Sequence, residues 1–211
     1  MSSLRLVYSA DREAATLEEA SDRQLLERIR GRDERALDEL VRRKAEPLTT
    51  LGLRYLGDRE EARDIVQLAF LRIWDSADRY DPRWSPNTWI YRITTNLAID
   101  ALRSRRGREA RMTIGAEFDH QLTDRRWATD FARLEETEVQ SIFQELAADL
   151  SERQRAVFLL REVEGLSSAE VADVLGCRES TVRNHLFNAR KQLRRELRRR
   201  YPEYAARHGE A

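Results

Sequence analysis

The chain has 211 residues, and its 38 basic side chains balance 38 acidic ones. This length suits one or two small domains, each with enough residues to bury a core. No run approaches the roughly 20 apolar residues that span a bilayer, and the first ten residues lack the apolar segment of a secretory signal. We therefore expect a cytoplasmic protein without membrane insertion. The one cysteine and three histidines are scattered and form no metal-ligand cluster, so neither a metal nor a cofactor is expected.

The usual catalytic signatures are missing from the sequence, which argues against an enzyme. There is no phosphate-binding G-x-x-x-x-G-K-[ST] loop and no G-x-S-x-G nucleophile elbow, and the carboxylates are dispersed. Positive charge is nevertheless segregated: residues 65–106 carry seven basic and four acidic side chains, and Arg190–Arg200 carries seven basic side chains against Glu196 alone. Such segregation creates local positive surfaces on a neutral molecule.

The spacing of apolar residues predicts an all-α fold. Residues that favour helix N-termini precede most of the periodic segments: Ser21 with Gln24, Asp58 with Glu61, Ser85 with Pro86, Ser151 with Gln154 and Ser167 with Glu170. In chain order, the predicted helices cover 22–30, 33–56, 59–77, 86–105, 137–148, 152–163, 168–175 and 179–199. Pro47 is expected to bend or interrupt the second of them.

Residues 107–136 lose this periodicity, and we interpret them as a flexible linker between two small helical domains. The spacing of Trp127, Phe131 and Leu134, by four and three residues, indicates that the end of the linker is already helical. The predicted division is an N-terminal tail over 1–20, a first domain over 21–106, the linker, a second domain over 137–200 and a C-terminal tail over 201–211.

In the first domain, the predicted helix 59–77 has one apolar face and one polar face. The residues expected to face the core are Ile65, Leu68, Ala69, Ile73 and Trp74. Asp64, Gln67 and Arg72 are expected to lie more outward.

The segment that follows mixes aromatic residues with arginine and asparagine, which are the side chains that stack on and read unpaired bases. Trp89 belongs to an apolar stripe and is expected in the core. For Trp84, both stacking on a base and packing in the core remain open.

In the second domain, the run from Ser167 to Leu197 has the spacing of a helix-turn-helix. A small residue, Ala172, is followed four positions later by Gly176, where a tight turn needs a positive φ, and then by the apolar Val182. An ordinary helical hairpin has similar spacing, but here the outward residues of the last helix are donors to bases and phosphates. These are Arg178, Ser180, Thr181, Arg183, Asn184, Asn188, Arg190 and Lys191. This pattern favours DNA binding.

Two segments together resemble a known family. The sequences DIVQLAFLRIWDSADRYDP and TWIYRITTNLAIDALRSRRGR, followed by LSERQRAVFLLREVEGLSSAEVADVLGCRESTVRNHLFNARKQLRREL, resemble the extracytoplasmic-function (group IV) sigma factors of bacterial RNA polymerase, which belong to the sigma-70 family. The resemblance covers residues 21–106, similar to sigma domain 2, and 137–199, similar to sigma domain 4. Leu68 stands where the family often has an acidic residue.

The resemblance implies a function and partners. The protein would bind core RNA polymerase, through the β′ clamp helices and the β flap, as a monomer in the holoenzyme. It would direct recognition and melting of promoter DNA, with an anti-sigma factor as a further partner. Asp64, Gln67 and Arg72 would contact polymerase, and the recognition helix would read the −35 element. Contacts to the −10 element would come from Trp84, Asn87, Thr88, Arg92, Asn96 and Arg103.

Two alternative functions remain at this point. A helix-turn-helix regulator that acts without core polymerase would need its own dimer interface or sensor domain, for which the sequence offers no motif. A helical protein-interaction module would need neither the Arg190–Arg200 run nor the polar recognition face.

Overall fold

The computed structural model describes residues 17–113 and 131–202, with only the backbone described over 109–113 and 131–138. These residues form helices and no strands, as predicted. The first group of helices is α2 (Asp22–Arg30), α3 (Glu34–Leu56), α4 (Arg59–Ser76), the short η1 (Ala77–Arg79) and α5 (Pro86–Thr113). The second group is α6 (Phe131–Leu146), α7 (Glu152–Phe158), the π-helical turn η2 (Leu159–Val163), α8 (Ser168–Leu175) and α9 (Glu179–Arg200).

The helix starts are formed by the cap residues that the sequence indicated. Ser21, Ser151 and Ser167 each accept a hydrogen bond from the third backbone N–H of their helix, and the Gln or Glu at that position closes a capping box. Asp58 accepts from two N–H groups at the start of α4. The helix α3 passes through Pro47 without interruption, contrary to one of the two predicted outcomes.

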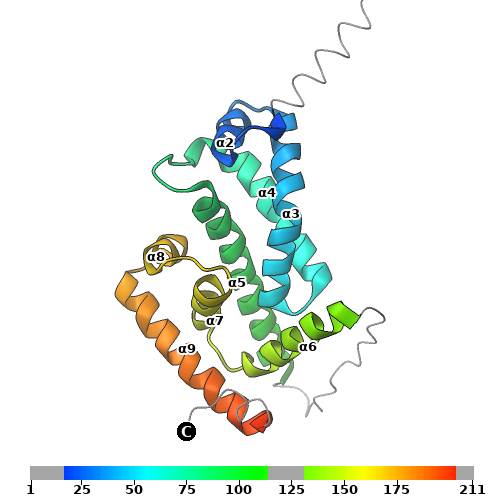
Figure 1. Ribbon diagram of the computed structural model, residues 1–211, viewed down its shortest axis with the longest axis vertical. Coiled ribbons are helices and arrows are strands. Elements are labelled where there is room, and N and C mark those ends of the chain that lie inside the picture. Colours follow the sequence, from blue (N-terminus) through cyan, green and yellow to red (C-terminus); the bar gives the residue numbers. More distant parts are fainter. Residues whose placement is uncertain (1–16, 114–130, 203–211) are drawn as a thin grey trace, which may run out of the picture.

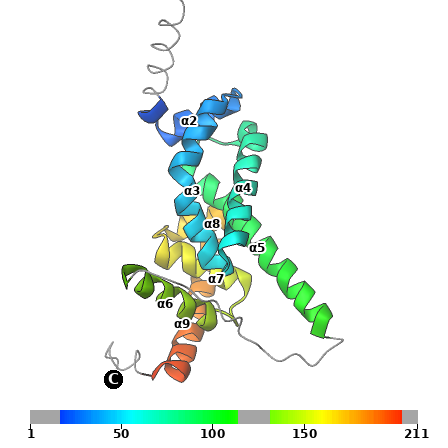
Figure 2. The same ribbon diagram turned by 90° about the vertical axis from the view of Figure 1, so that its right-hand side faces the viewer.

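Helices α2 to α5 pack around one apolar cluster, which includes Leu25, Leu40, Phe70, Ile73 and Ile90. In Figure 1, α3 and α4 lie side by side and α5 descends between them and the second group of helices. Figure 2 shows the end of α5 projecting away from α3 and α4. A cluster of this kind supplies the rigid support on which exposed side chains of α4 and α5 can be held.

The helix-turn-helix lies in α8 and α9. Gly176 ends α8 with φ of 60°, the left-handed conformation that the turn required. Val182 and Leu186 on α9 are buried against Val171 and Leu175 of α8. The predicted inner faces of both helices are therefore confirmed.

One apolar cluster is shared by the two groups of helices, which the sequence did not predict. This cluster joins Tyr55, Leu97 and Ala98 of the first group to residues of α7, η2, α8 and α9, among them Leu160 and Val171. The helix α8 packs directly on α5 (Figure 1). In this closed arrangement, each group covers apolar surface of the other.

Polar contacts reinforce the closed arrangement at the C-terminus of α3. Gln140 and Gln144 donate to the carbonyl of Leu53, and the buried Arg155 donates to the carbonyl of Tyr55 at 2.6 Å. The last carbonyls of a helix lack partners within it and form the negative end of its dipole, so a cation there is favourable. Burial, with Arg106 and Arg105 nearby, lowers the pKa of Arg155 to about 10, so this side chain is still charged at neutral pH.

A second polar contact lies beside it at Glu164, just after η2. Its carboxylate accepts from Arg54 of α3 at 2.9 Å and from the Tyr91 hydroxyl of α5 at 2.9 Å. Burial and the Glu164 carboxylate raise the pKa of Tyr91 to about 12, so its hydroxyl remains a donor. Glu164 thus ties the second group of helices to two helices of the first.

The helix α5 continues to Thr113 instead of 105, further into the predicted linker than expected. The helix α6 begins at Phe131, which is earlier than residue 137 but agrees with the helical spacing of Phe131 and Leu134 at the end of the linker. Residues 114–130, the middle of the predicted linker, and most of both predicted tails lie outside the described residues. Leu17, which was placed in the N-terminal tail, is buried in the first cluster. The proposed domain limits remain predictions.

Candidate functional site: three exposed surfaces

The first surface is the outward face of α4. Asp64, Gln67 and Arg72 are exposed there, and Ile65, Ala69 and Ile73 on the opposite face are buried, as predicted. Leu68 was wrongly expected in the core: its side chain is 48% exposed, beside Leu71 at 55%. On a helix, position 68 follows the buried Ile65 by three residues but lies at the edge of the apolar stripe. Two neighbouring exposed leucines among polar residues are typical of a protein-binding face.

The second surface is a pocket of about 610 Å³ between the end of α4, η1 and the first half of α5. It is lined by Arg72, Asp75, Ser76, Arg79, Asp81, Trp84, Trp89, Arg92, Ile93 and Asn96. Three of the predicted base-contacting residues, Trp84, Arg92 and Asn96, are thus brought together here. An open pocket with an aromatic face and both donors and acceptors at its rim can hold a planar polar ring.

Packing fixes the position of Trp84 in this pocket. The Arg92 guanidinium lies over its indole ring at 4.6 Å, and the buried Tyr80 donates its hydroxyl to the backbone carbonyl of Trp84 at 2.9 Å. Trp89 packs against Tyr80, with 5.3 Å between the ring centres. Trp84 is only partly buried: one part of its surface packs against the first cluster and another part lines the pocket, and stacking on a base stays a prediction.

Thr88 is withdrawn as a DNA contact, because its side chain is buried with only 4% exposed. Its hydroxyl lies 2.7 Å from that of Ser85, and its backbone N–H donates to Ser85 as part of the cap of α5. The neighbouring Asn87 is exposed and accepts from Lys44 of α3 at 2.8 Å. Arg103 is exposed but lies 11 residues beyond Arg92, about 17 Å along the helix, and does not line the pocket.

The third surface is the outward face of α9 and the turn before it. All eight predicted residues lie on accessible positions: six are exposed, and Thr181 and Asn188 are half-buried. Arg183 pairs with Glu179, one turn earlier on α9, and Arg190 with Glu162 of η2. Phe187 is 65% exposed between them, and the sequence reasoning missed it. Its position, off the buried stripe of Val182 and Leu186, was the available signal.

The end of α9 holds its positive charge around one buried carboxylate. Glu196 pairs with Arg195, Arg199 and Arg200. Burial acts to raise the pKa of Glu196, but its hydrogen bonds and ion pairs with these arginines outweigh burial and hold it below its usual range. Part of the basic run is therefore neutralised locally and fixed in orientation.

Known proteins resemble this chain over both groups of helices. The family model described as Sigma-70 region 2 matches residues 40–108, and that of Sigma-70 region 4 matches residues 140–193. The chain is 34% identical over 187 residues to the RNA polymerase sigma-H factor of Pseudomonas aeruginosa, covering 86% of this chain and 96% of that protein. The chain belongs to the extracytoplasmic-function sigma factors of the sigma-70 family.

Two solved structures share the fold of this sigma factor. CnrH in complex with the cytosolic domain of CnrY matches with a TM-score of 0.63 at 25% identity, over 86% of this chain and 99% of that one. The sigma factor RpoE of Bartonella quintana, in complex with the anti-sigma factor NepR, matches with a TM-score of 0.56 at 20% identity, over 76% and 96%.

The family matches assign the three surfaces to two regions of a sigma factor. The α4 face and the pocket lie in region 2, and the α9 face lies in region 4. Sigma factors as a family are initiation factors and not enzymes. Over residues 17–113 and 131–202, none of the helices of this sigma factor has the length and apolarity to cross a membrane.

Proposed function

We propose that this sigma factor binds core RNA polymerase, brings it to promoters and promotes opening of the −10 region, without catalysing a reaction itself. The observation that carries the proposal is the pocket in which Trp84 and Arg92 stack beside Asn96, on a domain whose α4 face is separately exposed. One domain can thus contact polymerase and DNA at the same time.

The α4 face is the proposed contact with the β′ clamp helices. Leu68 and Leu71 offer apolar area, and Asp64, Gln67 and Arg72 surround them with polar groups. An interface with an apolar centre and a polar rim is the common arrangement of protein complexes. The second domain is proposed to reach the β flap. We further propose that the protein acts as a cytoplasmic monomer within the holoenzyme.

The pocket is proposed to hold one unpaired base of the −10 element. Unpairing a base costs a few kcal/mol, and a base that enters a pocket shifts the equilibrium toward the open duplex. Trp84 offers the stacking surface, Asn96 offers hydrogen bonds and Arg92 offers positive charge to the backbone.

The α9 face is proposed to read the −35 element in the major groove. Arg183 and Asn184, near the start of the helix, have the donors that base edges require, and Phe187 can contact a thymine methyl group. Linking weak contacts to both elements through one polymerase raises their effective concentration.

The closed arrangement must open for both elements to be bound. About 25 base pairs separate the −35 and −10 positions, roughly 85 Å of B-form DNA. The helix α9 has 22 residues, about 33 Å, and joins the shared core through Val182 and Leu186. Because α8 packs on α5, the helix that lines the pocket, the closed form cannot reach both elements.

Both solved structures described above are complexes with a second protein, one of them an anti-sigma factor. An anti-sigma factor is therefore a proposed partner.

The proposal is tested by mixing the purified protein with core RNA polymerase in the absence of DNA. We expect a stoichiometric complex, and weaker binding for the double variant Gln67→Ala, Arg72→Glu, because both side chains lie at the rim of the α4 face. Omitting DNA matters because Arg72 also lines the pocket. Arg30→Glu, an exposed charge reversal at the end of α2, is the control. Absence of a complex with the wild-type protein would contradict the proposal.

A further inference from the structure

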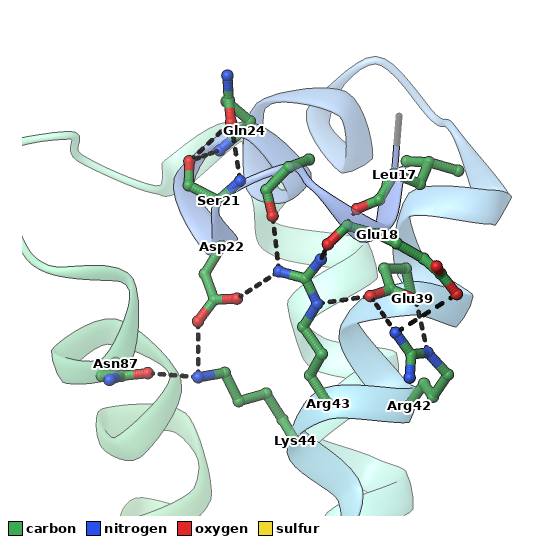
Figure 3. A network of polar contacts seen from close by, with 11 residues as sticks. Leu17, Glu18, Ser21, Asp22, Gln24, Glu39, Arg42, Arg43, Lys44 and Asn87 are labelled. Carbon is green, nitrogen blue, oxygen red and sulfur yellow. Dashed lines mark hydrogen bonds and ion pairs between the residues drawn. The ribbon is translucent and has the colours of Figure 1, made fainter. Parts of the chain in front are cut away.

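A polar network links the start of α5 to α2 and α3 (Figure 3). The Lys44 ammonium of α3 donates to the side-chain oxygen of Asn87 at 2.8 Å and pairs with Asp22 of α2 at 2.6 Å. Asp22 also pairs with Arg43 at 3.3 Å. Lys44 thus contacts, from a different helix, a residue that the family resemblance places at the −10 element.

The network holds Lys44 in place from several sides. Its side chain is only 20% exposed, and its partner Asp22 lies in the first turn of α2. Arg43, the next residue on α3, donates to the carbonyls of Leu17, Glu18 and Ala20 and pairs with the buried carboxylate of Glu39 (Figure 3). An ammonium that is fixed in this way is a directed contact and not a mobile surface charge.

The chemistry of Lys44 decides which way the Asn87 amide is turned. An ammonium group only donates hydrogen bonds, so the amide must face it with the oxygen. Turning the amide over would bring its NH₂ group against three N–H donors and a positive charge. Lys44 therefore fixes the orientation of the Asn87 amide, with the oxygen turned toward Lys44 and the NH₂ group left for other partners.

We propose that Lys44 is a positioning residue for promoter recognition, because it holds the Asn87 amide in one orientation, with the oxygen on Lys44 and the NH₂ group available as a donor. This inference rests on the proposed function and on the −10 contact that the family resemblance implies for Asn87. While Lys44 holds the oxygen, Asn87 favours a base with an acceptor, such as a carbonyl oxygen or a ring nitrogen. A base that offers only a donor would have to share the amide oxygen with Lys44.

The experiment measures base preference with a promoter library randomised over the −10 element and transcribed by reconstituted holoenzyme. Asn87→Ala should relax the preference at one position about fivefold or more. Lys44→Met, which is uncharged and of similar length, frees the amide to turn over, so bases with a donor group should gain at that same position. In the double variant, Lys44→Met should add nothing to Asn87→Ala, because Lys44 acts through Asn87.

Arg42→Met is the matched control, since it removes a positive charge from the same helix, and Arg42 pairs with Glu39 and Glu18 instead of Asn87. It should leave base preference unchanged. If Lys44→Met destabilises the fold, Lys44→Gln retains a polar partner for Asp22 and should relax preference in the same direction, because its amide can face Asn87 with either group.

The outcomes separate this inference from the proposed function. If the wild-type holoenzyme starts transcription and Asn87→Ala relaxes one position while both Lys44 variants keep the wild-type preference, the inference is wrong and the −10 contact stands. If Lys44→Met lowers transcription equally for all bases, in the Asn87→Ala background as well, Lys44 acts as a charge on the DNA backbone and the inference is wrong. If Asn87→Ala changes no preference, both the contact and the inference fail, whereas binding to core polymerase remains a separate result.

Discussion

At the scale of single residues, the pocket is organised by Trp84, which is held by Tyr80 behind it and covered by Arg92 in front. We expect Trp84→Ala to impair transcription from duplex promoters more than from templates already open at −10. Stacking on an aromatic ring is worth about 1–3 kcal/mol per base and matters most where unpairing must be offset. Trp84→Phe, which keeps an aromatic face, should show a smaller defect. Equal defects on both templates, together with a lowered melting temperature, would assign Trp84 to packing alone.

Glu39 gives a residue-scale expectation for the stability of the fold. Hydrogen bonds from Arg42 and Arg43 hold the pKa of this buried carboxyl below its usual range, although burial acts in the opposite direction. A carboxyl with a lowered pKa in the folded state stabilises above its unfolded pKa, about 4.3, and this stability is lost as pH falls through the folded value.

We therefore expect Glu39→Gln to lower the free energy of unfolding at pH 7 by about 1.5–3 kcal/mol, the range for hydrogen bonds to a charged group. The variant should also lose less stability than the wild type between about pH 5 and pH 3. Urea unfolding at a series of pH values measures both effects. Glu60→Gln removes an exposed carboxylate from α4 and should stay within about 0.5 kcal/mol of the wild type at pH 7. Parallel curves for Glu39→Gln and wild type across the acid range would contradict this account.

At the scale of helices, local sequence signals predicted most of the elements. Capping boxes at Ser21, Ser151 and Ser167 and the positive φ at Gly176 need only neighbouring residues, so they could be read in advance. The errors lie where tertiary packing decides. Leu68 stands at the edge of an apolar stripe, and its exposure depends on how α4 is turned against its neighbours. Thr88 is a polar residue that is buried because its hydroxyl contacts Ser85 in the α5 cap.

The two ends of α9 are expected to contribute differently to DNA binding: its start to base specificity and its end to affinity. Arg183 lies near its start, whereas Arg194 and Arg198 lie three and four turns further on and form no ion pair within the part of the chain that the structure describes. We expect Arg183→Ala to cost about 1–3 kcal/mol on the preferred −35 sequence and to relax one or two base positions.

Neutralising Arg194 and Arg198 together should weaken all promoters similarly and reduce the salt slope by about one for each arginine that binds a phosphate. A −35 library transcribed at two salt concentrations by each mutant holoenzyme tests both expectations. An Arg183→Ala holoenzyme with the wild-type base preference would exclude Arg183 as a base contact.

At the scale of the whole molecule, the sequence predicted two domains but not their contact. The shared core is built from residues far apart in the chain, such as Tyr55, Leu97 and Val171, and no local pattern records which apolar faces meet. The donors that reach the end of α3 are equally distant, since Arg155 contacts a carbonyl 100 residues earlier. Periodicity shows that a helix has an apolar face but does not show what covers it.

We expect the contact between the domains to break when core polymerase binds, so that the closed form opens. Glu164 joins the domains through Arg54 and Tyr91, whereas Glu162, two residues earlier, pairs with Arg190 inside the second domain. Hydrogen bonds to a charged group contribute about 1.5–3 kcal/mol, so Glu164→Ala should raise the open population of the free protein about 10- to 100-fold. Glu162→Ala is the matched control and should change it little.

Energy transfer between two dyes measures this opening, with cysteines placed by Arg30→Cys on α2 and Arg198→Cys on α9 in a Cys177→Ser background. Both labelled positions are exposed, one in each domain. Transfer should differ between the free protein and the holoenzyme of every variant, and Glu164→Ala should move the free protein toward the holoenzyme value, because in the holoenzyme both promoter elements must be within reach. Equal transfer in the free protein and the holoenzyme would mean that the domains stay closed on polymerase. An equal shift for Glu162→Ala would remove Glu164 as the contact that holds them, since that substitution leaves the interdomain bonds to Arg54 and Tyr91 intact.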